Sequence, residues 1–153
     1  MSVRALRRRH AIDTNVWIDA FRDPDESDAL DAFVAAWSPY LVMPAVVAQE
    51  LLAGCRTDVD RRRVRARAIE PFARLGRILA PSAAAWVASG DVLARLAPRD
   101  TVPTRAFAND VLLAATCREH GVVLVTRNLR DFRRIARQLA HEVVAPWPGI
   151  AAP

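Results

Sequence analysis

Short apolar runs alternate along this chain with segments of helical periodicity, and this alternation constrains the fold more than any other feature. Residues 122–126, VVLVT, form a continuous apolar run, which is typical of a parallel strand covered by helices on both faces. We predict further short strands at 11–12, 40–43 and 141–144. Strands that alternate with helices predict an α/β fold, here a three-layer α/β/α sandwich with a mostly parallel central sheet.

The helices are predicted from apolar residues at helical spacing and from capping signals. A helical turn follows Asp13, and an Arg-rich helix at 58–76 is expected to bend or end near Pro71, because proline has no backbone N–H to donate. We expect residues 1–153 to form a single domain, with residues 1–9 as a flexible basic extension. A misassigned start and an extra RNA contact are the alternatives for this extension. The other predicted helices span 25–37, 44–54, 82–97, 104–121 and 129–140.

The composition removes several chemistries. All 22 basic residues are arginines, so a Schiff base, a phosphate-loop lysine and a Ser–Lys dyad are excluded. No apolar run reaches the roughly 18 residues of a membrane span, and no secretory signal follows the basic N-terminus. Cys55 and Cys117 lack metal or redox spacing and are expected to be reduced thiols, so we expect a cytoplasmic protein without membrane association. The net charge of +5 weakly favours a polyanionic partner.

Three acidic residues interrupt apolar patterns, where an unpaired charge is costly. Asp13 ends the first predicted strand, Glu50 shares a helical face with Val47, and Asp110 shares one with Ala114. Ligands of open α/β sheets bind at the carboxyl ends of the strands, so we expect the three carboxylates to meet there in one pocket. Their repulsion would raise their pKa values unless a cation offsets it, and oxygen ligands without His or Cys favour Mg²⁺ or Mn²⁺. For any single acid, a helix cap or an ion pair is the alternative.

Four segments resemble the motifs of a known family. In chain order they are IDTNVWIDA, PAVVAQELLAG, FANDVLLAAT and VVLVTRNLRDF, and together they resemble the motifs of PIN-domain proteins, most closely the VapC-type toxins of bacterial toxin–antitoxin pairs. The resemblance spans residues 11–144. It implies an endoribonuclease that holds one or two Mg²⁺ or Mn²⁺ ions through acidic residues.

The resemblance also implies roles for individual residues. Asp13, Glu50 and Asp110 match the family's acidic metal ligands and catalytic residues. Asn128 stands at the fourth catalytic position, where many relatives carry an acid. Asp131, one helical turn later, is the alternative occupant of that position. The small polar positions that surround the site in the family are matched by Thr14, Asn15 and Thr126.

Hydrolysis is expected to use a water activated by the metal, without a covalent enzyme intermediate. The three histidines, at 10, 120 and 141, lie at element ends and are expected to be solvated or capping residues. The arginines at 61–67 are expected to form a solvated helix face or a partner surface. RNA phosphates are expected to be contacted by Arg127, Arg130, Arg133 and Arg134.

The rival interpretation is a PIN-like module that binds RNA or protein without cleaving it, and the amide at Asn128 keeps it open. A haloacid-dehalogenase-type phosphatase is excluded because Asn15 stands where that chemistry needs a second aspartate, and because the chain has no lysine.

Two protein partners are implied by the resemblance: a small cognate antitoxin that covers the active-site groove, and a second copy of the chain in a homodimer. An antitoxin arginine is expected to reach the acids. The antitoxin is expected to dock on apolar side chains that follow the first acid. The alternative is that these side chains complete the core of the domain. These side chains are Trp17, Ile18, Phe21, Leu30, Phe33 and Trp37.

Overall fold

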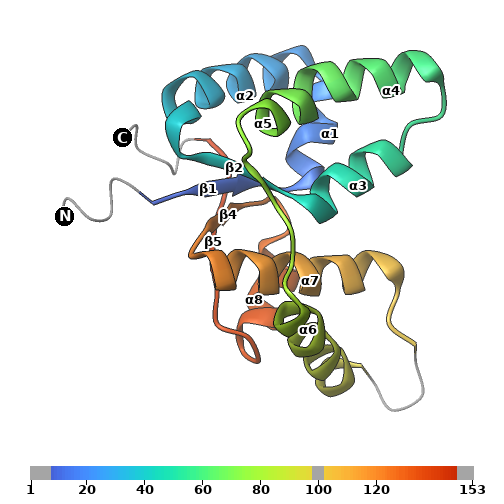
Figure 1. The fold of residues 1–153 in the computed structure, drawn as a ribbon, viewed down its shortest axis with the longest axis vertical. Helices are drawn as coiled ribbons and strands as arrows, with labels where there is room; N and C mark the ends of the chain where they lie inside the picture. The colour runs from blue at the N-terminus through green and yellow to red at the C-terminus, as the bar shows by residue number, and fades with distance from the viewer. Residues whose placement is uncertain (1–7, 98–101, 148–153) are drawn as a thin grey trace.

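The structure is a computed structural model that describes residues 8–97 and 102–147. Within these residues a five-stranded sheet has the order β3-β2-β1-β4-β5, and every pair of neighbouring strands is parallel. Figure 1 shows α1, α2, α4 and α5 above the strands and α6, α7 and α8 below them, which confirms the predicted three-layer α/β/α class. The strands are β1 (His10–Ile12), β2 (Leu41–Pro44), β3 (Ile78–Leu79), β4 (Val123–Val125) and β5 (Glu142–Val144).

Most helices begin or end at a capping residue. Asp13 and Asp23 cap α1 and α2, Ser82 and Thr104 cap α6 and α7, and Gly121 ends α7 in the left-handed conformation. The bounds are α1 (Thr14–Arg22), α2 (Pro24–Trp37), α3 (Ala45–Ala53), α4 (Asp58–Val64), α5 (Glu70–Arg74), α6 (Ala83–Leu96), α7 (Arg105–His120) and α8 (Leu129–Ala136), with a 3₁₀ turn η2 (Ser38–Tyr40) and a π-helical turn η3 (Arg65–Ile69).

The bend predicted near Pro71 is present as the π-helical turn η3. The backbone N–H of Glu70 donates to the carbonyl of Arg65, five residues earlier, in place of the α-helical bond to Ala66. Pro71 has no N–H with which to continue the α-helical ladder, so the hydrogen-bond register shifts immediately before it. The predicted Arg-rich helix is therefore divided into α4, η3 and α5, and it ends at Arg74.

Three local expectations are corrected. The segment after Asp13 is a nine-residue helix, α1, and not a single turn. Strand β3 was not expected, because only Ile78 and Leu79 pair with β2, too short a run to show a period. Residues 1–7 of the expected basic extension lie outside the described residues, whereas Arg8 pairs with Glu142 and the side chain of Arg9 donates to the carbonyl of His120.

The aromatic residues after the first acid lie mostly in the core. Trp17, Phe33 and Trp37 are buried together with Leu30, so the core alternative applies to them. His10 is also buried, in contrast to the expectation, because it lies within β1 and its ring centroid is 4.5 Å from that of Trp37. Both cysteines are free thiols. No helix in the described ranges has the length and apolarity needed to cross a bilayer.

Candidate active site

Asp13 lies where β1 ends, and its side chain is almost fully buried. Its Oδ1 accepts a hydrogen bond from the backbone N–H of Thr14 at 2.7 Å. Its Oδ2 accepts bonds from Asn15 Nδ2 at 2.9 Å and from Thr126 Oγ1 at 2.6 Å. Because Thr126 directly follows β4, the strand next to β1, the carboxyl ends of two adjacent parallel strands fix one carboxylate between them.

Glu50 reaches the same region from the last turn of α3. Its Oε2 accepts a bond from Thr14 Oγ1 at 2.6 Å, and its Oε1 accepts one from Asn109 Nδ2 at 2.8 Å. Thr14, Glu50 and Asn109 also line one cavity of about 460 Å³, which opens beside the acidic cluster. Sequence reasoning missed Asn109, although it lies in the FAND motif directly before Asp110.

Asn128, one candidate for the fourth position, bonds both to the third predicted acid, Asp110, and to the other candidate, Asp131. Its side-chain amide donates to Asp110 Oδ2 at 3.3 Å and to Asp131 Oδ2 at 3.1 Å, while its backbone N–H donates to Thr126 Oγ1 at 3.0 Å. The structure therefore brings Asn128 and Asp131 together beside Asp110, so that neither candidate is remote from the cluster.

The electrostatics of the cluster reflect both burial and repulsion between carboxylates. Burial raises the pKa of Asp13, and the charge on Glu50 adds to this, against hydrogen bonds from Thr126 and Thr14 that lower it. Burial, followed by the charges of Asp13, Glu50 and Asp131, raises the pKa of Asp110 to about 7. The cluster therefore carries more negative charge than its own hydrogen bonds offset.

The donor types fit a hard divalent cation. The available ligands are carboxylate and amide oxygens, which Mg²⁺ and Mn²⁺ prefer, and a cation would offset the repulsion that raises the pKa of Asp110. Within residues 8–97 and 102–147, however, no three acidic, His or Cys side chains stand close enough to hold one ion as they are. Metal binding would therefore draw the carboxylates inward.

Comparison with known proteins identifies the family. The sequence profile of the PIN domain matches residues 11–138. The chain belongs to the PIN-domain family. This confirms the resemblance carried by the four motifs, and the match includes all four predicted catalytic positions.

Solved structures share the fold of this PIN domain. The DNA-bound VapBC complex from Salmonella typhimurium contains a chain that is 22% identical, with a TM-score of 0.66 over 90% of this chain and 98% of that one. A FitAB complex bound to the IR36 DNA fragment gives 20% identity and a TM-score of 0.65 over 90% and 94% of the two chains. FitAcB from Neisseria gonorrhoeae gives 21% identity and a TM-score of 0.63, over 90% of this chain and 98% of that one. No similar sequence is found among curated proteins.

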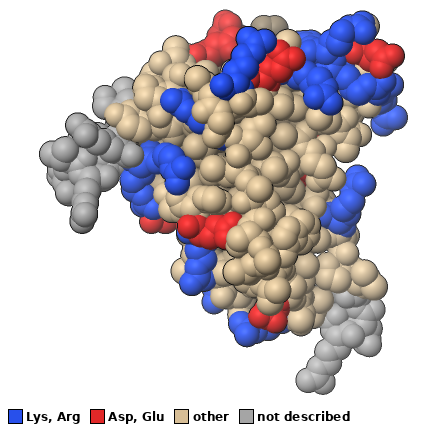
Figure 2. Space-filling view, in the orientation of Figure 1, with Lys and Arg blue, Asp and Glu red and all other residues tan. Residues whose placement is uncertain are grey.

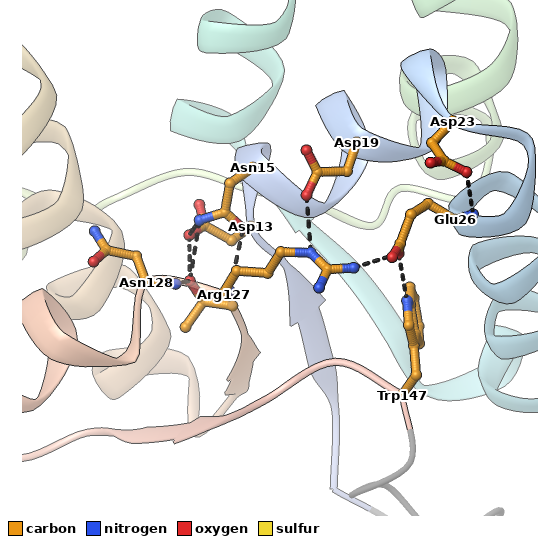
Figure 3. A network of polar contacts seen from close by, with 9 residues as sticks. Asp13, Asn15, Asp19, Asp23, Glu26, Arg127, Asn128 and Trp147 are labelled. Carbon is orange, nitrogen blue, oxygen red and sulfur yellow. Dashed lines mark hydrogen bonds and ion pairs between the residues drawn. The ribbon is translucent and has the colours of Figure 1, made fainter.

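The four arginines expected to contact RNA have different environments in the PIN domain. Arg127 pairs through Nε with Asp19 Oδ2 at 2.9 Å and also pairs with Glu26, as Figure 3 shows. Arg134 donates to the carbonyl of Leu96 at 2.6 Å and lies over the ring of Phe107. Arg130, Arg133 and Arg134 are all exposed on α8, and within the described residues Arg130 and Arg133 make no ion pair.

A second cavity extends the acidic site along α1, α3 and α4. It has a volume of about 400 Å³ and is lined by Ile18, Phe21, Glu50 and Val64 among others. Ile18, Glu50 and Gly54 line both cavities, so the two adjoin. Figure 2 shows arginine side chains gathered over α4, the helix that carries Arg61, Arg62 and Arg63. The expected solvated face at 61–67 is not wholly solvated, because Arg63 and Arg67 both lie over the ring of Phe21.

Proposed function

We propose that this PIN domain is a Mg²⁺- or Mn²⁺-dependent endoribonuclease and the toxin of a toxin–antitoxin pair. The observation that carries the proposal is the acidic cluster at the carboxyl ends of β1 and β4, where Thr14 bonds to both Asp13 and Glu50. There burial, followed by the charges of Asp13 and Glu50, raises the pKa of Asp110 to about 7. Family membership supports a hydrolase of nucleic acids. The likeness to chains of VapBC and FitAB complexes supports the toxin role, and a cytoplasmic location follows from it.

Asp13, Glu50 and Asp110 would hold the cation. A bound divalent ion activates water and offsets the charge that develops on the phosphate. The chain itself orients these ligands: the Thr14 backbone and the Asn15 and Thr126 side chains fix Asp13. Two further side chains, Thr14 and Asn109, fix Glu50.

Phosphate contacts are proposed for Arg130 and Arg133, which are exposed on α8, the helix that begins beside Asn128. Both are free to follow an RNA backbone across the acidic site, which would otherwise repel it. Arg127 and Arg134 already bind protein groups, so we assign them no phosphate contact.

The antitoxin is proposed to dock in the 400 Å³ cavity. Ile18 and Phe21 remain partly exposed there, whereas the other aromatic candidates are buried. Because Glu50 lines this cavity, an antitoxin arginine could reach its carboxylate. The proposal includes a homodimer, which would place two sites along one RNA.

The experiment is hydrolysis of a mixed RNA pool by the purified protein, with Mg²⁺ and with EDTA, and with Asp110→Asn as the matched control. Cleavage that needs Mg²⁺ and is lost in the variant supports the proposal. The second candidate, a binding module without catalysis, is favoured by the amide of Asn128 at the fourth position. RNA binding without cleavage at any Mg²⁺ or Mn²⁺ concentration would establish that candidate in its place.

A further inference from the structure

Arg127 lies at the centre of a polar network that connects the end of the described chain to the acidic site. Its guanidinium binds two carboxylates, Asp19 on α1 and Glu26 on α2. Glu26 in turn accepts a hydrogen bond from the indole N–H of Trp147 at 3.0 Å. Figure 3 shows the Arg127 side chain extending away from Asp13 toward Glu26, with Asp19 above its guanidinium and Trp147 below Glu26.

The backbone of Arg127 belongs to the site itself. Its N–H donates to Asn15 Oδ1 at 3.3 Å, and Asn15 donates through Nδ2 to Asp13 Oδ2 at 2.9 Å. The two neighbours of Arg127 in sequence, Thr126 and Asn128, bind Asp13 and Asp110 respectively. Three consecutive residues after β4 therefore hold the acidic cluster, and the side chain of the middle one is anchored on α1 and α2.

Trp147 is held against α2 in a conformation that needs support. Its φ of 50° places a bulky residue in the left-handed region, which costs free energy unless surrounding contacts maintain it. The contacts are the bond to Glu26 and the packing of its ring, whose centroid is 5.2 Å from that of Phe33. Trp147 also lies beyond residues 11–138, the part of the chain that the family profile matches.

The environment of Arg127 suits an anchor better than a phosphate ligand. A phosphate that approached the guanidinium would also meet the carboxylates of Asp19 and Glu26, whose combined charge exceeds that of one arginine. Single surface ion pairs contribute little, but a guanidinium shared by two carboxylates, one of them held by a third residue, forms a network that restricts its members.

We propose that Arg127 is a positioning residue: by anchoring the loop after β4 to α1 and α2, with Trp147 holding Glu26 in place, it keeps Asp13 and Asn128 in register for the metal. This rests on the proposed function, because the relative positions of Asp13 and Asn128 matter for a metal-dependent site. The anchor itself is a property of the metal-free fold, so part of the test needs no activity.

The test compares Arg127→Gln with Arg130→Gln, a nearby exposed arginine proposed as a phosphate contact, and with Trp147→Phe, which keeps an aromatic ring and removes the N–H. We expect Arg127→Gln to lower kcat and weaken Mn²⁺ binding by about tenfold or more, as supporting residues of metal sites do, with KM changed less than about twofold. Trp147→Phe should also lower kcat and weaken Mn²⁺ binding, each by a smaller factor. Arg130→Gln should raise KM more than it lowers kcat, and it should reduce the salt dependence of RNA binding.

A readout without metal or RNA separates this proposal from the proposed function. In the metal-free protein, Arg127→Gln and Trp147→Phe should shift the NMR signals of the Asn15 side-chain amide, whereas Arg130→Gln should leave them in place. If the wild-type protein cleaves no RNA but these shifts appear, the proposed function fails and the anchor stands. An Arg127→Gln variant that matches Arg130→Gln in KM and salt dependence, or that changes neither Mn²⁺ affinity nor the Asn15 signals, overturns the anchor.

Discussion

At the scale of single residues, Asp110 shows how the site departs from what stability alone favours. The side chain is half-buried, the charges of three other carboxylates act on it, and within the described residues the amide of Asn128 is the one side chain that donates to it. Such an arrangement costs free energy in the absence of a cation, since both burial and repulsion disfavour the ionised form. The proposed metal site accounts for this residue better than folding stability does.

The first prediction concerns the stability of the metal-free protein. The pKa of Asp110 in the folded state, about 7, lies above its ordinary value of 3.8, so its contribution to stability is present below pH 3.8 and is lost as the pH rises through 7. In EDTA at pH 8, Asp110→Asn should therefore raise Tm by about 2–4 °C, the shift that roughly 1 kcal/mol produces in a domain of this size. At pH 4 the difference should nearly vanish. Thermal unfolding followed by circular dichroism measures both, and a variant less stable than wild type at pH 8 would contradict the prediction.

The second prediction concerns the fourth catalytic position. Asn128→Asp should weaken the metal-free fold, because it adds a charge beside Asp110 and Asp131, and should tighten Mn²⁺ binding by about tenfold. Asp131→Ala should reduce cleavage less than Asp110→Ala does. Mn²⁺ calorimetry and initial cleavage rates measure these effects. If Asp131→Ala is as damaging as Asp110→Ala, the role belongs to Asp131.

At the scale of elements, local chemistry accounts for most boundaries. Strands β1, β2, β4 and β5 could be predicted because each is a short, mostly apolar run next to a helical segment. Strand β3 could not, because two paired residues show no period. The division of the Arg-rich helix could be located from Pro71, but not its π-helical form, which depends on how η3 packs. Helix α1 was underestimated because Asp13 and Asn15 were interpreted as site residues when Asp13 also caps the helix.

The third prediction uses two glycines of adjacent helices. Gly121 ends α7 with φ of 63°, so Gly121→Ala should destabilise the fold by about 1 kcal/mol, because an L side chain disfavours this conformation. Gly90 lies inside α6, where an added Cβ meets no atom within 4 Å, so Gly90→Ala should stabilise by about 0.5–1 kcal/mol. Urea unfolding measures both. Changes of the same sign in the two variants would contradict this interpretation of the helix end.

At the scale of the whole molecule, the site depends on contacts that no local pattern reveals. Asp13, Glu50 and Asp110 could be predicted because each breaks an apolar pattern and matches a motif. Asn109 resembles any polar residue of a helix, and its partner Glu50 lies 59 residues earlier. The ion pairs of Arg127 could not be predicted either, because its partner Glu26 lies 101 residues away.

The fourth prediction concerns the partner. Expression of the protein alone should arrest growth, and co-expression of its small cognate antitoxin should restore growth and yield a complex. The substitution Phe21→Glu should weaken this complex, because it places a charge in the apolar part of the 400 Å³ cavity. The RNA cleavage rate of the free variant provides the control for folding. A protein that is harmless alone would contradict the toxin role, and a complex unaffected by Phe21→Glu would exclude this docking site.

The measurement that most directly tests the acidic cluster as a metal site is a calorimetric titration of the wild-type protein and of Asp110→Asn with Mn²⁺ at pH 7.5. Asp13 follows β1, Glu50 lies on α3 and Asp110 on α7, and burial together with the charges of the other two raises the pKa of Asp110. We predict saturable binding to the wild type that releases protons from the cluster, and an affinity at least about tenfold weaker in Asp110→Asn. Equal affinity in the two proteins, or no binding to either, would contradict the assignment of this cluster as the metal site.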